Sequence, residues 1–256
     1  MINFTKDWHF NMLGIYNYNK IGSFSNLFSF IKDNHTKVEG DIVEAGVYRG
    51  HSLISIAKLL KDLGSEKKVY GFDTFTGFPP VYHEKDNLSE FSKMYEEGLI
   101  SKDHLESVKL NQMLLEKFSN KTFEKNIKNI SSSGDFENTN LELIKKKIEY
   151  LELDNIELIQ GDFSETMSAS KKIEKVMAAI IDCDLYESYQ VSLDFIWQQL
   201  SPKGFVHLDE YYSLKFPGAR RAVTEFISSN RDAQLGTESA EADFERWFLI
   251  KDSPLK

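Results

Sequence analysis

The chain has 256 residues, of which 41% are apolar and 28% charged, and its formal net charge is −9. Its length and apolar fraction suit one large globular domain, whereas the acidic balance argues against a nucleic-acid-binding surface spread over that domain. The single cysteine excludes an intrachain disulfide and a cysteine-based zinc site. No apolar run reaches the roughly 20 residues that span a bilayer, and no signal-peptide pattern begins the chain, so we expect a cytoplasmic protein.

The first part of the chain predicts an N-terminal helical arm followed by a strand–helix–strand unit. Residues 1–40 form the arm, with a helix expected over 23–34. A short strand over 41–46 ends at a glycine, an apolar helix follows over 52–63, and a second strand over 68–73 ends in an acid. This order is the layout of a βαβ unit, which predicts an α/β fold with a parallel sheet covered by helices on both faces.

Residues 81–150 interrupt this α/β pattern. Helices are expected over 105–118 and 141–151, separated by a polar, turn-rich segment over 126–140 that is expected to be a mobile loop. The block is either a helical decoration on the sheet edge or a lid over the site, because long insertions in compact domains are often lids. We carry the lid insertion forward as a hypothesis.

Alternation of strands and helices resumes after the insertion. Strands are expected over residues 155–160, 176–181, 204–209 and 246–251, the last of them as a closing edge strand. The helices between them are expected over 188–200 and, just after Pro217, over about 218–229. The chain, 1–256, is therefore expected to be a single domain.

Glycines and acidic residues follow five of the expected strands. Ligands of open parallel sheets bind outside the carboxyl ends of the strands. Acids are poor strand formers, so their repeated placement there indicates a functional site. The residues at these five ends are Glu44-Ala-Gly46, Asp73, Gly161-Asp162, Asp182-Cys-Asp184 and Asp209-Glu210.

The first three of these ends suit a nucleoside that carries little negative charge. Asp73 ends the second strand, where an acid can accept hydrogen bonds from both ribose hydroxyls. Asp162 can receive the exocyclic amine of an adenine, although either aspartate can also cap a helix. Glu44 and these two acids would repel a phosphate. The turn from Gly46 to Gly50 also departs from the dinucleotide fingerprint G-x-G-x-x-G, and by itself it is equally consistent with a plain strand-to-helix turn.

Four acids follow two successive strands and indicate a second part of the site. They are Asp182, Asp184, Asp209 and Glu210. Adjacent strands lie about 4.8 Å apart, so Asp182 and Asp209 can converge. Several hard oxygen donors at one point are expected to bind Mg²⁺ or a similar cation, and helix capping with solvation at loop ends is the alternative.

Other residues near these ends are interpreted as structural. His207, inside an apolar strand, is expected to be a hydrogen-bonded core histidine. The adjacent acids disfavour a thiolate at Cys183. Phe78 is expected to pack in the core or against a substrate, and Arg220 with Arg221 to form a solvated helix face.

Five sequence blocks together resemble a known enzyme family. They are VEAGVYRGHS (43–52), GFDTFTGFPP (71–80), IQGDFSETM (159–167), IDCDLYESYQ (181–190) and HLDEYYSLKFPGARRAV (207–223). They are similar to the TylF/macrocin O-methyltransferase family, whose members have a Rossmann-like class I methyltransferase fold and methylate sugar hydroxyls of natural products with S-adenosylmethionine and Mg²⁺. The resemblance covers roughly residues 22–80 and 155–251.

The resemblance implies a role for each residue at the strand ends. Asp182, Asp209 and Glu210 would hold the metal, and Asp184 would be the general base. The family shows Asp-Asp-Tyr where this chain has Asp209-Glu210-Tyr211, and the longer glutamate puts the metal geometry in question. The cofactor would be bound by Glu44, Gly46, Val47, Tyr48, Gly50, Ser52, Asp73, Thr74, Phe75, Asp162 and Phe163.

We therefore expect an S-adenosylmethionine-dependent, Mg²⁺-dependent O-methyltransferase that acts on a hydroxyl of a sugar or glycosylated small molecule, in natural product or glycan biosynthesis. Its expected partners are a small-molecule, glycosyl acceptor and a second copy in a homodimer, rather than a nucleic acid or a membrane. Two alternatives stay open, an NAD-dependent Rossmann oxidoreductase and a non-catalytic cofactor-binding relative. The sequence names neither the acceptor nor the position methylated, and transfer to an amine also stays open.

Overall fold

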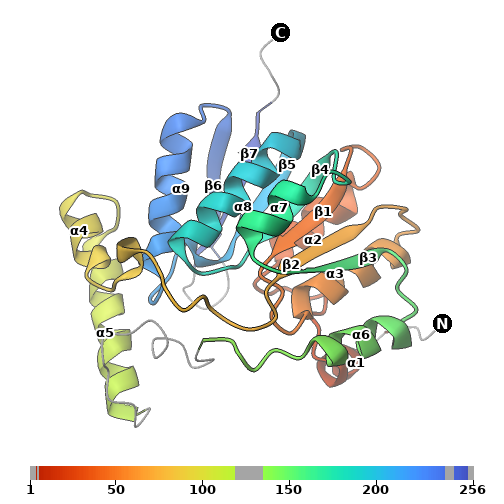
Figure 1. Ribbon diagram of the computed structural model, residues 1–256, viewed down its shortest axis with the longest axis horizontal. Coiled ribbons are helices and arrows are strands. Elements are labelled where there is room, and N and C mark those ends of the chain that lie inside the picture. Colours follow the sequence, from red (N-terminus) through yellow and green to blue (C-terminus); the bar gives the residue numbers. More distant parts are fainter. Residues whose placement is uncertain (1–3, 5, 119–134, 240–244, 253–256) are drawn as a thin grey trace.

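The computed structural model describes residues 4, 6–118, 135–239 and 245–252, and a seven-stranded sheet organises them (Figure 1). The strand order is β3-β2-β1-β4-β5-β7-β6. The first five strands of this order are parallel, β7 is antiparallel to β5, and β6 is antiparallel to β7. The strands are β1 (Asp41–Ala45), β2 (Val69–Asp73), β3 (Ile156–Gln160), β4 (Val176–Ile181), β5 (Leu200–Leu208), β6 (Ala233–Ser239) and β7 (Glu245–Lys251).

Apolar cores lie on both faces of the sheet, as the continuous apolar strand VMAAII predicts. Successive residues of β4 alternate between the two cores, with Ile180 in one and Ile181 in the other. The first core is closed by α1 (Asp7–Leu13), α2 (Ser25–Asn34) and α3 (His51–Asp62). The second core is closed by α7 (Phe163–Ala169), α8 (Tyr186–Gln199) and α9 (Pro217–Ser229).

The expected insertion splits between two sides of the molecule (Figure 1). The short 3-10 turn η1 (Glu84–Asp86), α4 (Glu90–Glu96) and α5 (Lys102–Phe118) lie on the side of α9, and α4 and α5 share a small apolar core of their own. By contrast, α6 (Leu141–Tyr150) buries Ile144 in the core beneath α3. The loop expected over 126–140 falls largely outside the described residues.

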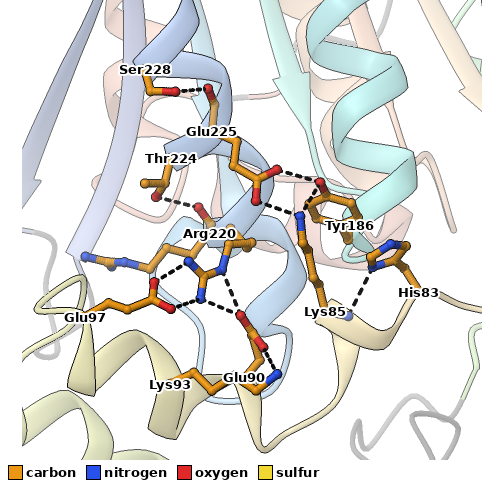
Figure 2. Close-up of polar contacts among 11 residues, drawn as sticks. His83, Lys85, Glu90, Lys93, Glu97, Tyr186, Arg220, Thr224, Glu225 and Ser228 are labelled. Atoms are coloured by element: carbon orange, nitrogen blue, oxygen red, sulfur yellow. Dashed lines mark hydrogen bonds and ion pairs between the residues drawn. The ribbon is translucent and has the colours of Figure 1, made fainter.

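The helix face at Arg220 and Arg221 is covered, so its assignment as a solvated face is wrong. Arg221 donates hydrogen bonds to Glu90 at 2.8 Å and to Glu97 at 2.5 Å, which fastens α4 to α9 (Figure 2). Arg220 donates to the carbonyl of Leu99 at 2.7 Å. Two adjacent arginines are typical of a solvated face only until another segment brings acids against them.

The closing strand of the sheet also differs from its prediction. Strand β7 lies between β5 and β6, so it is an interior strand, and β6 forms that edge of the described sheet. The sequence of β6, AQLGTES, is mostly polar and carries no strand signal of its own. None of the helices in the described residues is both long and apolar enough to cross a bilayer.

Candidate active site

A cavity of about 560 Å³ lies at the carboxyl ends of the parallel strands. It is lined by residues that follow β1, β2, β3 and β4 in the chain, which places the ligand site where the sequence predicts it. The predicted site residues on its wall are Gly46, Tyr48, Asp73, Thr74, Asp162, Phe163, Asp182 and Asp184.

The turn after β1 requires glycine because two strand ends meet there. Gly46 has φ +92°, and a Cβ at this position would lie 1.9 Å from the carbonyl oxygen of Asp182. The backbone of Asp182 in turn donates a hydrogen bond to the carbonyl of Ala45 at 2.9 Å. Any side chain at Gly46 would therefore push β1 and β4 apart at the cavity floor.

Asp73 shapes this turn with its carboxylate. Its Oδ2 accepts hydrogen bonds from the backbone N–H groups of Val47 and Tyr48, both at 2.8 Å, and its Oδ1 accepts one from Phe75 at 2.6 Å. A carboxylate has about four acceptor positions, so the side chain can hold the turn and still accept from a hydroxyl in the cavity. This dual use was not visible in the sequence.

Glu44 is fully buried beneath the turn and does not line the cavity. Its Oε1 accepts a hydrogen bond from the hydroxyl of Ser52 at 2.5 Å, and its Oε2 has no partner among the described residues. Burial raises the pKa of Glu44 to about 8, and the nearby Asp73 and Asp209 also raise it. A cation arriving above this carboxyl would favour its ionised form.

Five of the eleven predicted cofactor residues thus stand behind the cavity wall: Glu44, Val47, Gly50, Ser52 and Phe75. Gly50, at φ +73°, begins α3 and faces Ile144 of α6. Phe75 is buried in the core under α3. These residues support the turn rather than touch the cavity in this structure.

The four acids after β4 and β5 lie at neighbouring strand ends. Ile181 is paired with Leu208 in the parallel ladder, so Asp182 and Asp209 follow at the same level. Burial and the neighbouring carboxylates raise the pKa of Asp182 and of Asp184, and they raise the pKa of Glu210 to about 7. Such mutual destabilisation is relieved by protonation or by a cation.

Asp209 behaves differently because cations face it. Its Oδ1 lies 3.5 Å from Nε2 of His207 and 3.6 Å from Nη1 of Arg246. Burial alone would raise the pKa of Asp209, but His207 and Arg246 lower it below its ordinary value. His207 is buried as expected, although its Nε2 makes no hydrogen bond with the described residues.

The donor chemistry of these acids fits a hard divalent cation, whereas their arrangement does not yet form a metal site. They offer only carboxylate oxygens in a buried, mutually repulsive group. No three His, Cys, Asp or Glu side chains are grouped to hold a metal ion in the part of the chain that the structure describes. Binding by Asp182, Asp209 and Glu210 would need these side chains to turn toward one another.

Asp184 lies on the cavity wall in a strained backbone conformation. It is 6% exposed and has φ +61°, a region that residues with a side chain rarely adopt. Such outliers concentrate at functional sites. The strained turn directs the chain from β4 into α8, whose first residue is Tyr186.

A second wall of the cavity was missed as a site by sequence reasoning. Residues 77–86 line it, together with Phe136 and Leu185. Asp86 accepts a hydrogen bond at 2.8 Å from the backbone N–H of Tyr186, which caps α8 in place of the apolar N-cap residue Leu185. Only a contact spanning 100 residues reveals this role, and Phe78 was the sole residue of this wall that the sequence marked for substrate contact.

The same wall is fastened to α8 and α9 by a charged contact. Lys85 donates to Glu225 at 2.7 Å and to the hydroxyl of Tyr186 at 2.8 Å, and that hydroxyl donates to Glu225 at 2.6 Å (Figure 2). Gly218 permits the close approach, because a Cβ there would lie 1.9 Å from Oδ1 of Asp86. The wall is therefore held at a fixed distance from the turn that carries Asp184.

Comparison with known proteins gives matches of one kind. The family described as "Methyltransferase domain" matches residues 43–211. The chain is 27% identical over 175 residues to a tetracenomycin-C rhamnosyl 4'-O-methyltransferase of Streptomyces olivaceus, covering 68% of this chain and 54% of the relative. It is 24% identical over 190 residues to the mycinamicin III 3''-O-methyltransferase of Micromonospora griseorubida, covering 74% of this chain and 61% of the relative. The chain thus spans between half and two thirds of the length of these curated relatives.

Solved structures confirm the fold class. The O-methyltransferase NovP superposes with a TM-score of 0.60 at 19% identity, covering 88% of this chain and 76% of that chain. The calicheamicin methyltransferase CalS11 superposes with a TM-score of 0.59 at 19% identity, covering 96% and 81%. An O-methyltransferase from Bacillus cereus, solved in complex with SAH, gives a TM-score of 0.53 at 12% identity, covering 98% and 94%.

Proposed function

Because the chain belongs to the family of methyltransferase domains, we propose that it transfers the methyl group of S-adenosylmethionine to a hydroxyl of a sugar in a glycosylated small molecule. One observation carries the proposal. A single cavity joins Asp73 and Asp162, which suit a nucleoside, to Asp182 and Asp184, which suit proton transfer or metal binding. The curated relatives, which are named as sugar O-methyltransferases, support the acceptor class.

The cofactor would bind across the first three strand ends. Asp73, which keeps free acceptor capacity beside the turn, would bind the ribose hydroxyls, and Asp162 with Phe163 would flank the adenine. Gly46 and Tyr48 would line the methionine end. The acids of this region favour a cationic sulfonium over an anionic ligand.

Asp182, Asp209 and Glu210 would hold Mg²⁺, which supplies a Lewis acid that lowers the pKa of an alcohol. Asp184, on the cavity wall, would accept the proton that the acceptor hydroxyl loses as its oxygen takes the methyl group. The wall formed by residues 77–86 would hold the acceptor and exclude water, the part of the lid hypothesis that this geometry supports.

The oxidoreductase alternative is not favoured, because the family match is to methyltransferases and the glycine turn lacks the dinucleotide fingerprint. A non-catalytic cofactor-binding relative differs from the proposed enzyme in turnover alone. A homodimer and a cytoplasmic location stay predictions.

The first test is calorimetric titration with S-adenosylhomocysteine, with and without Mg²⁺. Micromolar binding is expected for the wild type and for Asp182→Ala, whereas methyl transfer to a panel of glycosides is expected only for the wild type. Asp194→Ala, which removes an exposed carboxylate elsewhere on α8, is the control and should retain transfer. No binding by the wild type would refute the cofactor assignment, and unchanged transfer by Asp182→Ala would refute the metal assignment.

A further inference from the structure

The cavity has a second half that the proposed cofactor residues do not line. We call it the acceptor half, formed by Phe78, Val81, Tyr82, His83, Phe136 and Leu185. The rings of Phe78 and Phe136 lie 5.0 Å apart, and Phe136 also meets Tyr48 edge-to-face at 5.1 Å. Phe136 therefore stands where the two halves join. An apolar, aromatic wall of this kind suits a sugar ring or an apolar aglycone.

Negative charge surrounds this space. Six carboxylate side chains line the whole cavity: Asp73, Asp86, Asp162, Asp182, Asp184 and Glu187. Within the described residues the lining contains neither lysine nor arginine. The cation adjoining the acceptor half, Lys85, is already paired with Glu225 at 2.7 Å.

Asp86 gives the acceptor half a specific polar group. The residue is 2% exposed, and while Oδ1 caps α8, its Oδ2 has no hydrogen-bond partner among the described residues. A buried oxygen without a partner is unfavourable until a donor reaches it. A ligand hydroxyl can supply such a donor, whereas an ionised phosphate cannot.

Building on the proposed function, we infer that the acceptor is an uncharged glycoside with an apolar or aromatic aglycone, and not a nucleotide-linked sugar. A diphosphate linkage would carry two negative charges into a space lined by carboxylates, where like charges repel. A divalent cation held by Asp182, Asp209 and Glu210 would offset those acids and leave Asp86 and Glu187 in place beside the acceptor. The acceptor is therefore supplied by a reaction that has already joined the sugar to its aglycone, and methylation follows glycosyl transfer.

Two sets of probes that share their sugars but differ in charge test this inference. Aryl glycosides, such as 4-nitrophenyl α-L-rhamnoside and its fucose and glucose counterparts, are titrated into the protein loaded with S-adenosylhomocysteine and Mg²⁺. The same sugars linked to thymidine diphosphate form the second set. We expect the best aryl glycoside to bind at least about tenfold more tightly than the best nucleotide-linked sugar, a difference of about 1.4 kcal/mol.

Charge reversal at the rim provides an internal check. Glu187 is exposed, lies in the first turn of α8 and lines the cavity, so Glu187→Lys should tighten binding of the nucleotide-linked sugar by about fivefold and leave the aryl glycoside unchanged. Glu165→Lys is the matched control, because Glu165 is also exposed in the first turn of a helix, α7, but lies off the cavity wall. It should change neither affinity.

Tighter binding of a nucleotide-linked sugar by the wild type would overturn the inference. Failure of every aryl glycoside to bind while S-adenosylhomocysteine binds would overturn it as well. Both results leave the cofactor assignment intact. Absence of S-adenosylhomocysteine binding would instead be the failure of the proposed function, which the titration of the cofactor alone detects.

Discussion

Replacing Glu44 with glutamine should change how the stability of the protein depends on pH. The buried carboxyl has its pKa raised from 4.5 to about 8, mainly by burial. Above pH 4.5 the unfolded chain loses this proton while the folded protein keeps it, so the free energy of unfolding falls by about 1.4 kcal/mol per pH unit until about pH 8. Between pH 5.5 and pH 8 this amounts to about 3 kcal/mol, a large part of a typical stability of about 5–15 kcal/mol. A glutamine side chain would be neutral in both states, so Glu44→Gln should abolish this part of the decline.

Urea unfolding at pH 5.5 and at pH 8, without cofactor, measures the difference. The wild type should lose about 3 kcal/mol more than Glu44→Gln over this interval, as derived from the shift of the pKa. The substitution keeps the oxygen that accepts from Ser52, so packing is preserved. Glu165→Gln, at an exposed carboxyl, is the control and should follow the wild type. Parallel pH profiles for the wild type and Glu44→Gln would show that Glu44 is ionised in the folded protein, and the reasoning would be wrong.

Two further substitutions test the packing around the site. Gly46→Ala should lower the stability by several kcal/mol and weaken S-adenosylhomocysteine binding, because its Cβ would lie 1.9 Å from the carbonyl oxygen of Asp182. Gly22→Ala, where no atom lies within 4 Å of the new Cβ, should keep both within error in thermal melts and titrations. Arg221→Ala should destabilise the protein by about 3 kcal/mol in urea unfolding, because it leaves the carboxylate of Glu90, 5% exposed, without its strongest partner. A loss below about 1 kcal/mol would show that the pair behaves as an exposed one.

The sheet could be predicted from the sequence because its strands carry local signals. The strand 176–181 is entirely apolar, and an acid directly follows it, so both its burial and its end are visible in six residues. The expected convergence of Asp182 and Asp209 is supported by the strand order, since β4 and β5 are parallel neighbours. The helix after β4 begins at Tyr186 rather than at the expected residue 188, a shift of the size usual at helix ends.

What the sequence did not reveal depends on contacts between distant segments. Strand β6 exists because β7 offers it a hydrogen-bonding edge, and its own residues, from Ala233 to Ser239, have little strand propensity. Arg221 is covered because α4 and the residue after it bring two glutamates to it. Asp86 reads as one acid in a charged segment until it is seen to cap α8. In each case the partner lies too far along the chain for spacing or periodicity to indicate it.

The fastening of the cavity wall sets an order in which the site can be assembled during synthesis. Residues 77–86 are made early, yet Tyr186, Gly218 and Glu225, which hold them, are made about a hundred residues later or more. At the usual rate of about 5–20 residues per second, the wall waits several seconds on the ribosome for its anchors. A nascent chain that ends at residue 211 would contain every residue that the family match covers, but it would lack the anchors on α9. Acceptor binding should therefore appear only after α9 has emerged.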